Sequence, residues 1–240
     1  PRTDVDPSFV AALMDNITQA AERGTRTLRL NGLEPLNAPY AVDLVRHARD
    51  VGFEEVLILS TCLPLADRTV AEQLFDVLPD RYRFYVPIYG GRPEVHDPLV
   101  GLPGAFDTLM TAVDNIRGLM DPEHGELIFT TVLMRGNIAH AQEMAWVVNP
   151  LSTWWEVHLP FPNSSSARDR YRDVAMPYKV FLDAMYPRDS SAIGELALGE
   201  VPACTAWAHQ AKTGHELVTV ERLRRRQPLS GTFYEVVGYV

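Results

Sequence analysis

The chain has 240 residues, of which 46% are hydrophobic and 22% charged, as is ordinary for a globular protein. Its net charge of −9 and the lack of a broad basic run argue against a nucleic-acid binder. No apolar run approaches the roughly 20 residues of a membrane span. Cys62 and Cys204 are too few for a disulfide framework, so we expect a cytoplasmic protein that binds neither nucleic acid nor membrane.

Helix and strand patterns alternate along most of the chain. Asp6 and Pro7 are the residue types of a helix N-cap and first turn, and the helix that they open is expected to stop at Gly24. Strands are expected at residues 26–30, 56–59, 82–89, 127–134 and 154–159. Helices are expected at about 40–51, 68–78, 105–120, 138–148 and 173–186. Such alternation predicts parallel βα units with right-handed crossovers.

The predicted fold is α/β, an open and partial βα barrel of the TIM type with parallel strands. It occupies residues 1–187, and the pattern then breaks, so 188–240 are expected to form a small C-terminal extension. Within the extension, residues 216–223 and 232–240 alternate weakly and predict a hairpin. The run 90–106 is expected to be a long loop, of the kind that often carries function.

The turn after the first strand carries the main site signal. Gly32 permits a backbone shape that other residues resist, and Pro35 prevents the strand from continuing. Glu34 therefore lies at the carboxyl end of a strand, where βα proteins place their chemistry.

Five motifs in order carry a resemblance to a known family. They are Asn31-Gly32-Leu33-Glu34-Pro35, Ser60-Thr61-Cys62, Tyr89-Gly90, the run from Glu94-Val95-His96-Asp97 through Gly101 to Gly104-Ala105-Phe106, and Arg135-Gly136-Asn137. Their order and spacing, between about Pro7 and Pro162, resemble the radical S-adenosylmethionine (radical SAM) superfamily, in particular its peptide- and cofactor-modifying branch. Typical members carry a Gly-Gly-Glu-Pro turn, a Thr-Asn-Gly turn and a basic-x-Asn turn at the corresponding strand ends.

The resemblance implies a TIM-like barrel enzyme with S-adenosylmethionine and a [4Fe-4S] cluster as cofactors. The cluster would cleave S-adenosylmethionine to a 5′-deoxyadenosyl radical, which would abstract hydrogen from a peptide, a cofactor precursor or another small molecule. Glu34 and the turn at Gly32 would hold the methionine amino end, and Asn137 would lie near the adenine. The implied cofactor-binding residues are Gly32, Leu33, Glu34, Pro35, Ser60, Thr61, Tyr89 and Asn137.

The chain departs from the family at the cluster. Family members hold the cluster with three cysteines after the first strand, because iron–sulfur clusters take thiolate ligands. No cysteine precedes Cys62, so no metal ligand is assigned. We expect the chain to be part of a longer product that includes this motif; otherwise it is a protein that has lost the cluster. Leu33 replaces the second glycine of the turn, which places an isobutyl group beside the cofactor or requires a negative φ.

Two other functions stay open. One is a degenerate, cluster-free barrel that binds a partner, and the other is a hydrolytic or lyase barrel with Glu34, His96 and Asp97 as acid–base groups. His96 and Asp97 are expected to form a pair that fixes their loop, and Cys62 to be a small buried residue. His158 lies in a strand and points either into the barrel or outward.

Overall fold

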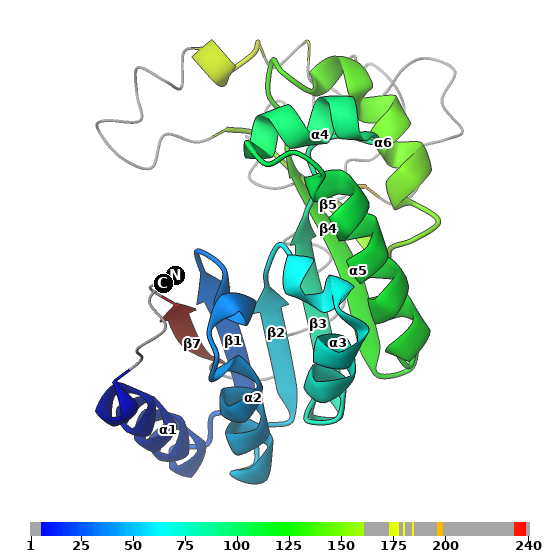
Figure 1. Ribbon diagram of the computed structural model, residues 1–240. Coiled ribbons are helices and arrows are strands. Elements are labelled where there is room, and N and C mark those ends of the chain that lie inside the picture. The colour runs from blue at the N-terminus through cyan, green and yellow to red at the C-terminus, as the bar shows by residue number, and fades with distance from the viewer. Residues whose placement is uncertain are drawn as a thin grey trace. The chain divides into compact units, whose positions relative to one another are not determined.

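A computed structural model describes residues 6–160, 173–177, 180, 184, 196–198 and 233–238 (Figure 1). The chain forms two compact units, which are described separately. Unit 1 contains Pro1–Val86, Asp107–Leu127 and Leu229–Val240, and unit 2 contains Pro87–Phe106 and Ile128–Pro228.

The strands of unit 1 run parallel. They are β1 (Thr27–Gly32), β2 (Glu55–Leu59), β3 (Arg81–Pro87) and β7 (Phe233–Gly238). Their order is β7-β1-β2-β3, and Leu28 lies opposite Val56, which lies opposite Tyr82. Because parallel neighbours in this register point their carboxyl ends the same way, the turns after β1 and β2 meet at one edge.

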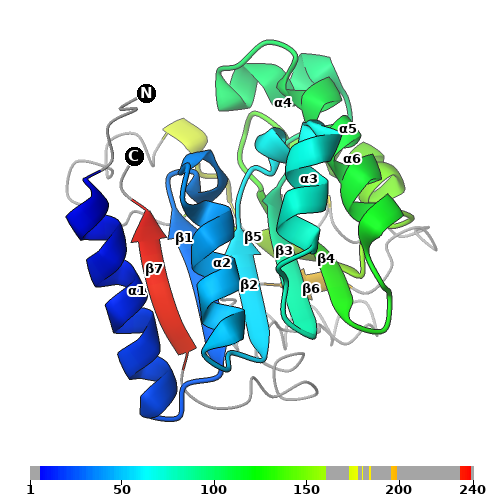
Figure 2. The same ribbon diagram turned by 60° about the horizontal axis from the view of Figure 1, so that its bottom comes forward.

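Helices cover one face of these strands. They are α1 (Pro7–Glu22), α2 (Ala41–Asp50), α3 (Arg68–Phe75) and α5 (Ala105–Leu119), of which α5 joins unit 1 from Asp107 onward. Figure 2 shows α1, α2 and α3 on the same side of the sheet. Alternate residues such as Leu28, Leu30 and Phe84 are buried, which is the period expected of strands with one face against helices.

The start of α1 follows from its sequence. The Asp6 side chain accepts a hydrogen bond of 2.9 Å from the Ser8 N–H, and Pro7 occupies the first helical turn. Gly24, at φ 91°, follows the helix end. The predicted cap and stop of this helix are therefore confirmed.

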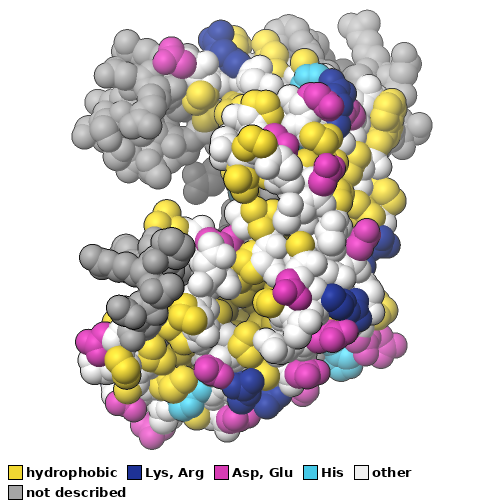
Figure 3. All heavy atoms as spheres, viewed as in Figure 1, with side chains coloured by type: hydrophobic (Ala, Val, Ile, Leu, Met, Phe, Trp, Pro, Cys, Tyr) yellow, Lys and Arg dark blue, Asp and Glu magenta, His cyan; other side chains and the backbone are white. Residues whose placement is uncertain are grey.

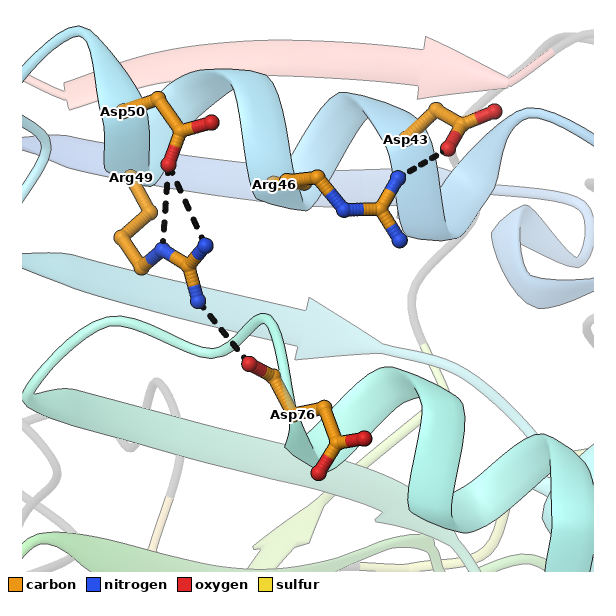
Figure 4. Close-up of polar contacts among 5 residues, drawn as sticks. All are labelled: Asp43, Arg46, Arg49, Asp50 and Asp76. Carbon is orange, nitrogen blue, oxygen red and sulfur yellow. Dashed lines mark hydrogen bonds and ion pairs between the residues drawn. The ribbon is translucent and has the colours of Figure 1, made fainter.

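The solvent face of α2 carries charged pairs (Figure 4). Arg49 donates to the carbonyl of Asp76, just after α3, at 2.9 Å, and it pairs with Asp50 at 3.2 Å. Arg46 pairs with Asp43. All these side chains are exposed, so the ion pairs contribute little to stability. Figure 3 shows acidic and basic side chains interspersed over the visible face of the described residues.

A buried charged group lies on the other face of the sheet in unit 1. The Glu55 carboxylate is 2% exposed; it accepts a 3.2 Å hydrogen bond from Thr27 and pairs with Arg83 at 3.1 Å. Arg83 also pairs with Glu126 at 2.9 Å. Buried charges persist only when paired, so this group fixes the starts of the strands, at the opposite end from the turns of the candidate site.

Unit 2 continues the βα pattern. Its strands are β4 (Gly125–Val132, in unit 2 from Ile128), β5 (Trp154–His158) and β6 (Leu196–Leu198), and they pair in parallel. Its helices are α4 (Pro93–Val100), the 3-10 helix η3 (Ile138–His140) and α6 (Ala141–Val148). Trp155, Phe129 and Met144 are buried in its core.

The α/β class and the parallel strand order within each unit are confirmed. The expected long loop over 90–106 is wrong in part, because Pro93–Val100 form α4. Pro93 at the first turn and Gly101 at φ 72° are good start and stop signals. Pro98 lies inside this helix. Because proline removes a helical N–H, its presence argued against a helix in the sequence.

The C-terminal predictions are tested only in part. Residues 233–238 form the expected strand, and it pairs in parallel with β1. The expected hairpin partner, 216–223, and the boundary at 187 lie outside the described residues. The helix expected at 173–186 is described at 173–177, 180 and 184, and of these 173–174, 180 and 184 are helical whereas Ala175–Pro177 are not. In the described part of the chain, no helix is long and apolar enough to cross a membrane.

Candidate functional site

The turn after β1 has a shape that its residues dictate. Gly32 has a φ of 141°, which disfavours any residue with a Cβ, and its N–H donates to the Asn31 side chain at 2.9 Å. Glu34 is extended, with φ −152°, and caps the 3-10 helix η1 (Pro35–Asn37). Its carboxylate accepts the Leu36 N–H at 3.2 Å, and Pro35 is buried as the first residue of η1. The capping bond directs the Glu34 side chain back over the turn.

The turn after β2 is more deeply buried. Ser60 is 5% exposed and Cys62 is 0% exposed, and the Ser60 Oγ accepts the Cys62 N–H at 2.8 Å. Cys62 has a φ of 57° and is the left-handed residue that precedes the 3-10 helix η2 (Leu63–Ala66). Thr61, between them, is half-buried.

The carboxylate of Glu34 joins these two turns. It accepts hydrogen bonds from the Ser60 hydroxyl, from the Thr61 hydroxyl and, at 2.8 Å, from the Thr61 N–H. The structure therefore brings together six of the predicted site residues, all in unit 1. They are Gly32, Leu33, Glu34, Pro35, Ser60 and Thr61. We call Glu34, Ser60 and Thr61 the carboxylate–hydroxyl cluster.

Cys62 behaves as a buried thiol behind this cluster. Burial raises its pKa, and the negative charge of Glu34 raises it further, so the thiol stays protonated. The prediction that Cys62 is a small buried residue is confirmed. A protonated thiol is a poor metal ligand.

Leu33 lies at the outside of the same turn. Its side chain is 76% exposed. Among the described residues, Cys62 is the non-glycine residue with a positive φ. Leu33 therefore has the negative φ that its Cβ favours.

Tyr89 and Asn137, the other two predicted site residues, belong to unit 2. The Tyr89 N–H donates to His96 Nδ1 at 3.1 Å, and burial raises the pKa of the Tyr89 phenol. The buried Asn137 amide accepts the Met134 N–H at 2.8 Å and donates to the Val132 carbonyl at 3.2 Å. Asn137 thus fixes its own turn, and for both residues a place beside a cofactor stays a prediction.

His96 and Asp97 fix their segment separately. His96 is 3% exposed and lies against the rings of Tyr89 and Phe106, and its Nδ1 accepts a backbone N–H. Burial lowers its pKa, and the charge of Asp97 opposes this shift. Asp97 accepts the N–H groups of Gly104 at 2.6 Å and Phe106 at 2.9 Å. These bonds give both side chains structural roles and do not favour acid–base chemistry.

Unit 2 contains a carboxylate–imidazole pair that the sequence analysis did not predict. Glu156, which is 6% exposed, lies 3.5 Å from Nε2 of His158 on the same face of β5. The signal was present, because Trp154, Glu156 and His158 alternate with the buried Trp155 and Val157.

Comparison with known proteins shows a similarity over part of the chain. Over 101 residues the chain is 31% identical to the "AdoMet-dependent heme synthase" of Methanosarcina barkeri (strain Fusaro / DSM 804). Part of this chain thus resembles an AdoMet-dependent protein. The match covers 42% of this chain and 28% of that relative, so the chain spans less than a third of its length. No family model matches the chain.

The two cofactors implied by the sequence differ in how well they fit these residues. The carboxylate–hydroxyl cluster carries a negative charge and hydroxyl oxygens, which suit an ammonium such as that of S-adenosylmethionine. The described residues contain no group of three or more His, Cys, Asp or Glu that could hold a metal ion, and the whole chain has two cysteines. These residues do not fit a four-iron cluster.

Proposed function

We propose that this chain carries the S-adenosylmethionine-binding part of a radical SAM-type enzyme. The observation that carries the proposal is the bonding of Glu34, at the end of β1, to Ser60 and Thr61, at the end of β2. Adjacent carboxyl ends of parallel strands are where βα proteins bind their ligands. The similarity to an AdoMet-dependent protein supports the same cofactor.

In the proposal, the carboxylate–hydroxyl cluster binds the amino acid end of S-adenosylmethionine. The ammonium of the ligand is drawn to the negative charge at Glu34, and the exposed Leu33 borders the bound molecule. In a complete enzyme of this type, a [4Fe-4S] cluster, which the described residues do not fit, would supply the electron for hydrogen abstraction from a peptide, a cofactor precursor or another small molecule. An open βα barrel with parallel strands is the fold that we propose around it.

Calorimetric titration of the purified chain tests the proposal. S-adenosylmethionine and S-adenosylhomocysteine should both bind, because both carry the amino acid group. 5′-Methylthioadenosine, which lacks that group, should bind at least about tenfold more weakly, the loss expected of one charge-assisted contact. Absence of S-adenosylmethionine binding at millimolar ligand would refute the proposal and leave the cluster-free binding module as the better account.

A further inference from the structure

We infer that Glu34 is a positioning residue, and that the ammonium of the ligand is contacted by the hydroxyl oxygen of Thr61. This inference rests on the proposed function, and it assigns the contact within the same site.

The Glu34 carboxylate has no acceptor position to spare. Its Oε1 accepts the Leu36 N–H and the Ser60 hydroxyl, and its Oε2 accepts the Thr61 N–H and the Thr61 hydroxyl. An ionised carboxylate offers about four lone-pair positions in all. Two of the four donors are backbone N–H groups, which cannot turn away unless a turn opens. A direct bond from an ammonium to Glu34 would therefore have to displace a donor of the chain itself.

The two hydroxyl groups differ in what they can still accept. Ser60 is buried, and its Oγ already accepts the Cys62 N–H while it donates to Glu34. Thr61 is half-buried, and its Oγ1 donates to Glu34 but accepts no hydrogen bond from the described residues. Among the described residues, none uses the remaining lone pairs of the Thr61 oxygen, so this oxygen can accept a hydrogen bond from a ligand.

The bond to Glu34 makes that oxygen a better acceptor. A hydroxyl that donates its proton to an anion gains electron density on its oxygen, because consecutive hydrogen bonds polarise one another. In an ammonium bound to Thr61 Oγ1, only the Thr61 hydroxyl separates the positive charge from the Glu34 carboxylate. The ammonium is therefore still attracted by the negative charge of Glu34. Glu34 thus orients and polarises the Thr61 hydroxyl, and it ties the two turns together when no ligand is bound.

The substitution Thr61→Val separates this arrangement from direct contact. It removes the hydroxyl oxygen and at the same time frees an acceptor position on Glu34. We expect the affinity for S-adenosylmethionine to fall about tenfold, as for one lost hydrogen bond to a charged group. The affinity for 5′-methylthioadenosine should stay unchanged, and Thr61→Ser, which keeps the hydroxyl, should bind as the wild type does. If the ammonium contacted Glu34 directly, Thr61→Val would bind with equal or greater affinity, and that result would overturn the inference.

Glu34→Gln tests the positioning role without any ligand. Because the carboxylate receives four donors from the chain, its replacement by an amide should lower the midpoint of urea unfolding of the free protein. Glu72→Gln is the matched control, because Glu72 is exposed and pairs with Arg68 on the surface of unit 1. A Glu34→Gln midpoint equal to that of the control would overturn the positioning role.

The two failures are distinguishable. If wild-type protein does not bind S-adenosylmethionine, the proposed function fails, and the Thr61 contact fails with it. If the wild type binds and Thr61→Val binds equally well, the proposed function stands and only the assignment of the contact is wrong.

Discussion

The indole Nε1–H of Trp155 donates a 2.8 Å hydrogen bond to the Thr131 hydroxyl, and both residues are 1% exposed. The same hydroxyl donates to the Ile88 carbonyl, also at 2.8 Å. One buried oxygen thus connects β5, β4 and the residue that follows β3. This contact anchors the core of unit 2 and predicts how the unit responds to substitution.

Thr131→Val should destabilise the protein, because it leaves the Trp155 N–H and the Ile88 carbonyl buried without their partner. Two such groups cost about 2 to 6 kcal/mol of unfolding free energy. Urea unfolding followed by tryptophan fluorescence measures the change. Thr131→Ser keeps the hydroxyl and should lose much less, and a Thr131→Val protein as stable as the wild type would contradict the role of these hydrogen bonds.

The stability of the protein should depend on pH through His96. The ordinary pKa of histidine is 6.5, and burial lowers the pKa of His96 below this value in the folded protein. The unfolded chain therefore binds the proton more readily than the folded chain does. Stability from this residue is therefore complete above about pH 6.5. It falls as the pH drops from there through the folded pKa. His96→Asn keeps an acceptor near the Tyr89 N–H but does not titrate.

Urea unfolding of wild type and His96→Asn at several pH values checks this prediction. The variant should be less stable at neutral pH, because it loses ring contacts with Tyr89 and Phe106. The difference between the two proteins should narrow as the pH falls. A difference that stays constant across this range would mean that His96 does not titrate differently in the folded and unfolded states.

Cys62 should react slowly with thiol reagents in the folded protein. Its side chain is fully buried, and both burial and the charge of Glu34 raise its pKa, whereas alkylation requires the thiolate. In a Cys204→Ser background, iodoacetamide should modify native Cys62 at least about a hundredfold more slowly than the denatured chain. Mass spectrometry follows the reaction, and rapid native modification would contradict the burial of this turn.

Local signals were sufficient for most elements and for one turn. Asp6 and Pro7 predicted the start of α1, because a cap and a first-turn proline act through neighbouring residues. Gly32 and Pro35 predicted where β1 ends, for the same reason. The sequence also placed Glu34 and the Ser60–Thr61 pair at neighbouring strand ends, because the order of parallel βα units usually follows the chain.

Only the tertiary structure decided what these side chains bind. Glu34 could have faced a ligand alone, but the register of β1 against β2 places three donors of the second turn on it. The Asn137 amide forms its hydrogen bonds within its own turn, and the residue type alone does not predict this. The strand at 233–238 pairs with β1 across some two hundred residues of chain. Such contacts depend on which strands become neighbours, and the spacing of residues along one strand carries no information about that choice.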